Sequence, residues 1–281
     1  MQVSYEEESF IVTDKKKRLG KSPAKSHPLM LSFSDYTTDK IPPPSTNFWH
    51  KKTSFEPRTY GNTEYGDCTR ASQAVFITHM ERLESRRTIK ITDDEVIKRY
   101  MDMTSRLYGG GDTGGFELDA LNEWRNPDLT IRDVKGHPYT IDAYTRINQA
   151  NIEEVKRAIY FSGSHGIKAC FSLPLAFQEN TDVWDIPEGQ QPIGEYLAGS
   201  WGGHSTCSAR DFDKDWLYFN HTWGVPDGKI SWRAFSIYCD EAYSVIDSVD
   251  SWRKKIAAAK ISFDLPKLIS DVNNVSPIKI K

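Results

Sequence analysis

Apolar residues recur at helical spacing through the first half of the chain. Thr92 is followed three residues later by Glu95, a capping-box pattern that predicts the start of a helix. A helix beginning at Cys68, a short one around Leu121 and another from near Asn151 share a three- and four-residue apolar spacing. In the helix predicted to begin at Cys68, the apolar positions are Ala71, Ala74, Val75, Ile77, Met80 and Leu83.

The hydrophobic period changes to two in the second half. Apolar side chains alternate through residues 167–173, which predicts a strand. Residues 204–211 and 215–221 predict two more strands joined by a short acidic turn, and a further strand is expected at 230–235. Because the helices precede the strands, we expect an α+β protein with an N-terminal helical half and a C-terminal antiparallel β half.

The two ends of the chain differ from its middle. Residues 1–40 hold a basic run, Lys15–Arg18, and little apolar periodicity, so we predict an extended or partly disordered N-terminal lead. We interpret the run as solvated charge rather than a site for phosphate or an acidic partner. Prolines 42–44 mark the entry to a folded domain expected over residues 41–250, and the weakly patterned residues 251–281 are expected to form a C-terminal extension.

Length and charge narrow the class of protein. The 281 residues suit one large domain or two packed subdomains. A formal net charge of −3 does not support a nucleic-acid partner. No apolar run approaches the ~20 residues that span a bilayer, and the acidic N-terminus lacks the pattern of a secretory signal. We expect a protein without a membrane partner, located in the cytoplasm or associated with a virion.

Four cysteines are present, without a metal-binding pattern. Cys68, Cys170, Cys207 and Cys239 form no CxxC pair, and in the absence of a secretory signal we expect free thiols. The acidic turn Asp211–Asp215 lacks the glycine and glutamate that a calcium loop requires. The sequence therefore predicts an available thiol and no metal site.

Cys68 is the candidate nucleophile. It lies in Gly66-Asp67-Cys68-Thr69, where a turn meets the first predicted helix. Unpaired amides and the partial positive charge at a helix N-terminus favour a thiolate, which is the attacking species. The alternative is a small buried residue that begins the helix.

His204 and Asn220 stand at the ends of two predicted strands. His204 follows Gly202 and Gly203, which allow close backbone approach, and its imidazole can take and return a thiol proton. The Asn220 carbonyl can accept from one imidazole nitrogen and so aim the other at the sulfur, with Trp223 shielding that bond. Taken singly, each is also compatible with a purely structural histidine or asparagine.

The order and spacing of these three residues carry a family resemblance. They follow one another as nucleophile, base and orienting residue, and 136 residues separate Cys68 from His204, within the interval of about 130–150 typical of papain-type enzymes. The prolines after Ile41 and the following Trp49 are similar to the start of the family's mature domain. The chain resembles a papain-like cysteine peptidase over roughly residues 41–250.

The resemblance implies roles for further residues. The family's oxyanion-hole glutamine lies six residues before the cysteine, where this chain has Asn62, whose amide would act with the Cys68 backbone amide. Gly114-Gly115 resembles the glycines that pair with an extended peptide, with a flexible loop as the alternative. Gly203 and Trp223 complete the implied substrate-binding set.

The sequence departs from the family pattern near both halves of the site. Asn62 is one methylene shorter than glutamine, and Thr69 replaces the tryptophan of plant and lysosomal members, so the nucleophile segment looks more like that of bacterial and viral relatives. The asparagine motif, Asn220-His221-Thr222-Trp223-Gly224, is one residue longer than usual. A separation of 16 residues from His204 favours Asn220 over His221 as the orienting residue.

These similarities imply a two-subdomain fold with the cleft between its halves. The implied reaction is hydrolysis of a polypeptide substrate through a thioester, which needs neither a metal nor an organic cofactor. Two other functions stay open: a catalytically impaired structural or binding protein, motivated by Asn62, and a cysteine-dependent acyltransferase or deamidase. Residues 1–40 are interpreted as a pro-segment that blocks the cleft or, equally, as a tether to a larger assembly.

Overall fold

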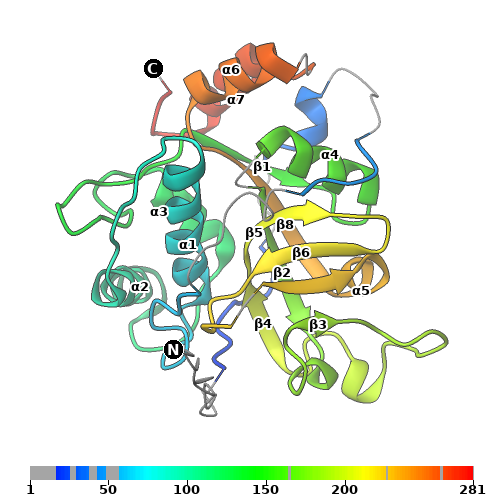
Figure 1. Ribbon diagram of the computed structural model, residues 1–281. Helices are drawn as coiled ribbons and strands as arrows, with labels where there is room; N and C mark the ends of the chain where they lie inside the picture. The colour runs from blue at the N-terminus through cyan, green and yellow to red at the C-terminus, as the bar shows by residue number, and fades with distance from the viewer. Residues whose placement is uncertain are drawn as a thin grey trace, which may run out of the picture.

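Helices and a twisted sheet form two sides of the molecule in the computed structural model of this chain (Figure 1). The structure describes residues 17–25, 30–37, 43–48, 57–163, 166–225, 227–259 and 262–280. The first sixteen residues, which include the start of the basic run, and the family-like Ile41, Pro42 and Trp49 lie outside the described residues.

Three helices make the helical half, as the apolar spacing predicts. They are α1 (Cys68–Leu83), α2 (Asp93–Tyr108) and α3 (Glu117–Trp124). Thr92 caps α2, because its hydroxyl accepts a hydrogen bond from the Glu95 amide at 3.2 Å. Helix α1 is almost entirely buried, since it packs on the sheet on one side and on α2 and α3 on the other. This position holds its N-terminus, and therefore Cys68, against the sheet.

An eight-stranded sheet makes the other half, with strand order β1-β8-β2-β5-β6-β7-β3 and β4 paired to β2. The neighbouring strands run antiparallel except β3 and β7. The strands are β1 (Ala143–Ile147), β2 (Ile167–Leu173), β3 (Val183–Trp184), β4 (Gly202–Ser205), β5 (Cys207–Phe212), β6 (Trp216–Asn220), β7 (Gly228–Ser231) and β8 (Cys239–Ile246).

Two strand predictions differ from the structure. The predicted strand 204–211 is two strands, because Thr206 interrupts the pairing and bonds the Ala169 carbonyl through both its amide and its hydroxyl. The predicted strand 230–235 ends at Ser231, where helix α5 (Trp232–Tyr238) begins. The Ser231 hydroxyl accepts from the Ala234 amide at 3.1 Å, and this N-cap turns the chain into a helix.

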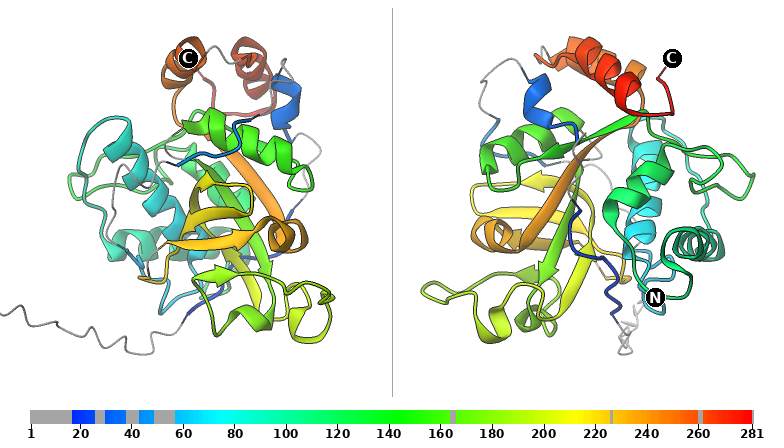
Figure 2. Two further views of the ribbon diagram at one scale, coloured as in Figure 1. Left: turned by 45° about the vertical axis from the view of Figure 1, so that its right-hand side comes forward. Right: turned by 180° about the vertical axis from the view of Figure 1, so that it is seen from behind.

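Elements from both ends of the chain gather beside the sheet. Helix α4 (Ile152–Ser162) packs on the strands, and helices α6 (Val249–Ala259) and α7 (Leu265–Val275) lie with the short 3-10 helix η1 (Phe33–Tyr36) at the top of the molecule in Figures 1 and 2. The Tyr36 hydroxyl donates to Asp271 at 3.0 Å. Leu268 is fully buried in the main core. Helices α6 and α7 thus pack on the domain that precedes them.

Two short 3-10 helices, η4 (Leu175–Phe177) and η5 (Gly194–Tyr196), complete the described elements. All four cysteines are buried free thiols, which confirms the expectation from their spacing. Among the described helices, none combines the length and apolar character needed to cross a membrane.

Candidate functional site

Cys68 is the first residue of α1 and is fully buried at the junction of helix and sheet. Burial raises the pKa of its thiol to about 12, against hydrogen bonds from the backbone of Ser205 and of Gly20 that lower it. The lowered pKa expected from the helix N-terminus is therefore outweighed here by burial. The Gly20 amide donates to the Gly203 carbonyl at 3.2 Å, so the backbone of Gly20 is fixed beside β4.

His204 lies in β4, opposite Phe171 of β2. Its ring stacks on that of Trp223, with centroids 4.1 Å apart. Within the described part of the chain, neither ring nitrogen of His204 has a hydrogen-bond partner. Burial, together with the nearby His221, holds the pKa of His204 well below its ordinary value, so the ring is neutral at neutral pH.

The two halves of the site meet through Ser205. Its backbone bonds the Cys68 thiol, and its hydroxyl lies 2.9 Å from that of Ser72 on α1. Because His204 precedes Ser205 in β4, this contact holds the strand carrying the imidazole against the helix carrying the thiol. Ser205 thus joins the strand that carries His204 to the helix that begins at Cys68, while the His204 ring contacts Trp184 and Trp223.

Asn220, the last residue of β6, pairs with Cys207 of β5 and has its side chain bonded to Asp227. Its side-chain amide donates to Asp227, and it lies on the half-exposed face of the strand, opposite the buried Phe219. His221 is buried, stacks on Trp223 with centroids 5.1 Å apart, and has its pKa lowered to about 3 by burial. His204 and His221 therefore both stack on Trp223, whereas Asn220 makes no bond to His204 in this structure.

Asn62 is buried beside the nucleophile turn. Its carbonyl accepts from the Thr222 hydroxyl at 2.6 Å, so the motif that follows β6 fixes the orientation of the amide. The amide nitrogen then donates to the carbonyls of Tyr65 at 3.1 Å and Arg18 at 3.4 Å. Asn62 thus presents a donor to a backbone carbonyl lying in the cleft, as an oxyanion-hole residue must.

The glycine-rich loop is hydrogen-bonded to the turn that precedes α1 and to α2. Asp112 accepts from the Gly66 amide at 2.8 Å and from the Tyr100 hydroxyl at 2.6 Å. The Tyr100 hydroxyl in turn accepts from the Gly114 amide at 2.8 Å. These bonds lock the loop to the turn that carries Cys68.

Residues 17–25, which we call the cleft segment, run between α1 and the sheet (Figure 2). The Gly115 amide donates to the Gly20 carbonyl at 2.7 Å, and the Ser22 amide donates to the Gly115 carbonyl at 2.9 Å. The Lys21 amide donates to the Gly203 carbonyl at 3.0 Å. The predicted substrate-binding glycines therefore pair with the chain's own N-terminal lead.

Trp223 also contacts the cleft segment. Its indole nitrogen donates to the Arg18 carbonyl at 3.1 Å. A cavity of about 340 Å³ remains along this contact, lined by residues 18–22 on one side and by Gly66, residues 112–114 and residues 201–203 on the other. The four residues predicted to bind substrate, Gly114, Gly115, Gly203 and Trp223, all contact the cleft segment or line this cavity.

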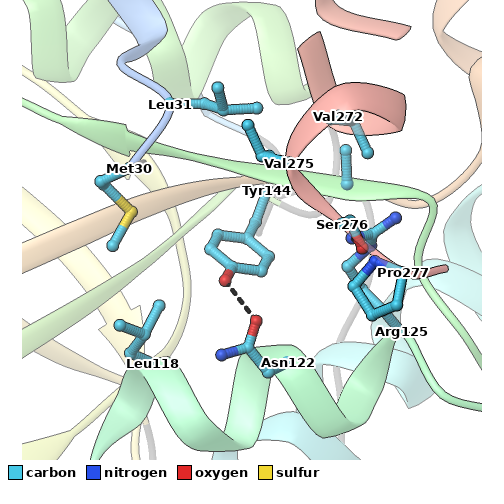
Figure 3. Close-up of a pocket in the computed structure, with 11 residues that line it drawn as sticks. Met30, Leu31, Leu118, Asn122, Arg125, Tyr144, Val272, Val275, Ser276 and Pro277 are labelled. Atoms are coloured by element: carbon cyan, nitrogen blue, oxygen red, sulfur yellow. Dashed lines mark hydrogen bonds between the residues drawn. The ribbon is translucent and has the colours of Figure 1, made fainter. Parts of the chain in front are cut away.

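A second cavity, of about 190 Å³, lies away from these residues (Figure 3). It is bounded by α3, β1 and the end of α7, and the Tyr144 hydroxyl donates to Asn122 across it. None of the candidate site residues lines it. Within the described residues, no group of three or more His, Cys, Asp or Glu side chains is placed to hold a metal ion.

Several solved structures share this fold. Xylellain, a cysteine protease from Xylella fastidiosa, has a TM-score of 0.63 and 16% identity, covering 84% of this chain and 98% of that chain. A cysteine protease from Carica candamarcensis has a TM-score of 0.51 and 14% identity, and the match covers 72% of this chain and 98% of that chain. The cysteine protease and lectin-like domains of Cwp84, a surface layer associated protein of Clostridium difficile, have a TM-score of 0.57 and 13% identity. This match covers 82% of this chain and 55% of that chain.

No family model and no curated protein sequence matches this chain. The structural likeness nevertheless extends over most of its length. The chain has the papain-like α+β fold, and the fold predicted from the resemblance is confirmed.

Proposed function

We propose that this protein is a cysteine peptidase in which Cys68 is the nucleophile and His204 the general base. The observation that carries the proposal is the contact of Cys68, at the N-terminus of α1, with the backbone of Ser205, the neighbour of His204. Helix N-terminus, thiol and imidazole are the elements that thiolate chemistry needs.

The reaction follows from these groups. His204 takes the thiol proton, the thiolate adds to the peptide carbonyl, and the Cys68 amide and Asn62 stabilise the oxyanion. His204 then gives the proton to the leaving amine as the carbon–nitrogen bond breaks, which leaves a thioester. Water, deprotonated by His204, releases the carboxylic acid product and restores the thiol.

Two residues are candidates for orienting the His204 imidazole, Asn220 and His221. The spacing along the sequence favours Asn220, which would have to exchange its bond with Asp227 for one with His204. The geometry favours His221, because its ring is buried and stacks on Trp223, the same residue on which His204 stacks. With its pKa at about 3, His221 is neutral and can accept a hydrogen bond from an imidazolium.

In the intact chain the cleft segment blocks the site. The Gly20 amide donates to the Gly203 carbonyl at 3.2 Å and the Gly20 carbonyl accepts from the Gly115 amide at 2.7 Å, so both walls of the cleft hold the backbone of the segment. It also buries the thiol and thereby keeps it protonated. We propose that residues 17–25 act as an intramolecular inhibitor, and that a polypeptide substrate enters when they leave. Tethering to a larger assembly remains the alternative role of the lead.

Labelling tests the proposal directly. The full-length chain and its Gly20→Ala variant are treated with an epoxysuccinyl peptide, and the intact mass is followed over time. We expect one adduct on Cys68, formed faster in Gly20→Ala and lost in Gly20→Ala/His204→Ala, together with hydrolysis of a peptide library by Gly20→Ala. A protein that labels no faster than an ordinary thiol and cuts no peptide after release is not a peptidase.

A further inference from the structure

Lys21 of the cleft segment fills a buried acidic pocket. Its ammonium lies 2.7 Å from Asp240 Oδ2 and 3.0 Å from Glu241 Oε1, and 1% of its side chain is exposed. The two carboxylates open strand β8, which belongs to the central sheet. The walls of the pocket are therefore part of the folded body, and only the cation comes from the lead.

Other residues hold the carboxylates in place independently of Lys21. The Ser172 hydroxyl donates to Asp240 at 2.9 Å, and the Tyr243 hydroxyl donates to Glu241 at 2.6 Å. Ser172 and Tyr243 lie on β2 and β8, which pair directly. The pocket thus keeps its shape when the cleft segment leaves.

The buried carboxylate of Glu241 needs a positively charged partner. Glu241 is 1% exposed, and burial raises its pKa, with Lys21 acting against that rise. The neighbouring Lys168 is bound to Glu117 at 2.5 Å, so it is already neutralised. An unpaired buried carboxylate is costly, and hence the emptied pocket favours a ligand that brings a cation back.

The pocket is placed to read a peptide in the cleft. Gly20 lies at the sulfur of Cys68, and the next residue, Lys21, pairs with the backbones of Gly115 and Gly203 while its side chain descends to β8. An extended chain that uses these backbone partners in the direction and register of residues 20–22 puts one side chain into the pocket.

We propose that Asp240 and Glu241 select a lysine or arginine side chain in the substrate, one residue from the residue held at Cys68 and on the Gly115 side. This inference rests on the proposed peptidase function. Asp240 Oδ1, buried without a partner among the described residues, supplies a further acceptor for the several donors of arginine.

The test uses full-length Gly20→Ala protein and internally quenched peptides that differ at one position, with lysine, arginine, norleucine or glutamate. Norleucine keeps the alkyl chain and removes the charge. We expect kcat/KM for lysine to exceed that for norleucine at least about tenfold, since bonds to charged groups contribute that much. Adding Glu241→Gln or Asp240→Asn should collapse this ratio.

A matched control separates the pocket from other lead contacts. Lys25 pairs with Asp119 at 2.7 Å outside the pocket, so adding Asp119→Asn should leave the lysine-to-norleucine ratio unchanged. Equal rates for lysine and norleucine, or a preference that survives both pocket variants, would overturn the proposal.

Binding supplies a readout that needs no turnover. A synthetic peptide of residues 17–25, with lysine or norleucine at position 21, is titrated into Gly20→Ala/Cys68→Ala protein by calorimetry. We expect about tenfold weaker binding of the norleucine peptide, and no difference between the peptides in Glu241→Gln. If no peptide is ever cut but this difference persists, the peptidase function fails while the pocket stands; equal binding overturns the pocket.

Discussion

Gly20 crosses Gly66 so closely that a β-carbon on Gly20 would lie 1.7 Å from the Gly66 carbonyl oxygen. The contact between the cleft segment and Gly203 is similarly close, since a β-carbon on Gly203 would lie 2.0 Å from the Lys21 carbonyl oxygen. The cleft segment can therefore occupy its place only because glycines meet there, and the smallest side chain at position 20 must displace it.

Gly20→Ala should accordingly release the cleft segment. We expect alkylation of Cys68 to become at least about tenfold faster, because the clash involves backbone atoms that cannot turn aside. The measurement is the iodoacetamide rate at pH 7 by intact mass. Ala24→Ser, at an exposed position of the same segment, is the control and should react as the unmodified chain does. Equal rates in the two variants would refute blocking by this segment.

The pH dependence of alkylation should report the same release. With a pKa of about 12, against an ordinary value of 9.0, the buried thiol gives a thiolate fraction that keeps rising as pH increases past 9. Once the segment has left, desolvation falls and the helix N-terminus favours the thiolate, so the curve for Gly20→Ala should level off at lower pH. Superimposable pH profiles would contradict this account of the raised pKa.

Paired variants should identify the residue that orients His204. We expect His221→Ala to lower kcat of the released enzyme more than Asn220→Ala, because His221 stacks on Trp223 as His204 does and Asn220 bonds Asp227. The pH profile of kcat should shift in the variant that removes the orienting group, which a merely structural loss would not produce. A larger loss and a shifted profile in Asn220→Ala would instead establish the role predicted from the spacing.

Asn62→Ala should lower kcat of the released enzyme by about 10²–10³, the usual cost of removing one oxyanion donor. KM should change far less, since the donor acts on charge that develops in the transition state. Thr222→Val is an instructive companion, because it removes only the bond that orients the Asn62 amide. Unchanged kcat in Asn62→Ala would remove this residue from the mechanism.

The C-terminal helices should contribute to the stability of the whole domain. Leu268 is fully buried in the main core, so Leu268→Ala should lower the free energy of unfolding by about 2–5 kcal/mol. Val275, which is 38% exposed, provides the control, and Val275→Ala should cost far less. Urea denaturation of the two variants measures both. Equal stabilities would mean that residues 251–280 are an independent appendage.

Local signals made much of the fold predictable. Thr92 with Glu95 and Asn151 with Glu154 are caps formed by neighbours in sequence, and both helices begin where those residues predict. Strand β8 was not predicted, because it is buried along nearly its whole length and shows no alternation. Ser231 lies within an apolar run that predicts a strand, and its role as a helix cap is visible only in the structure.

Motifs in the sequence indicate candidate site residues, whereas contacts between distant residues leave no such signal. Cys68 and His204 are candidates because of their flanking residues and spacing. Lys21 and Asp240 pair although they are 219 positions apart in the sequence, and no local sequence pattern predicts this contact. An adjacent pair of carboxylates at the start of an apolar segment, Asp240-Glu241, was the one signal available. The direction of the Cys68 pKa shift depends on burial by a segment that the sequence cannot place.

The cleft segment is joined through a short stretch of chain to η1, which is anchored in the core by Phe33 and Tyr36. It is therefore a tethered ligand with an effective concentration on the order of millimolar. A separate inhibitor of the same intrinsic affinity would dissociate as the protein is diluted, whereas this one returns to its own cleft. The blocked fraction should thus be independent of protein concentration, and only a competing ligand or a cut in the tether can change it.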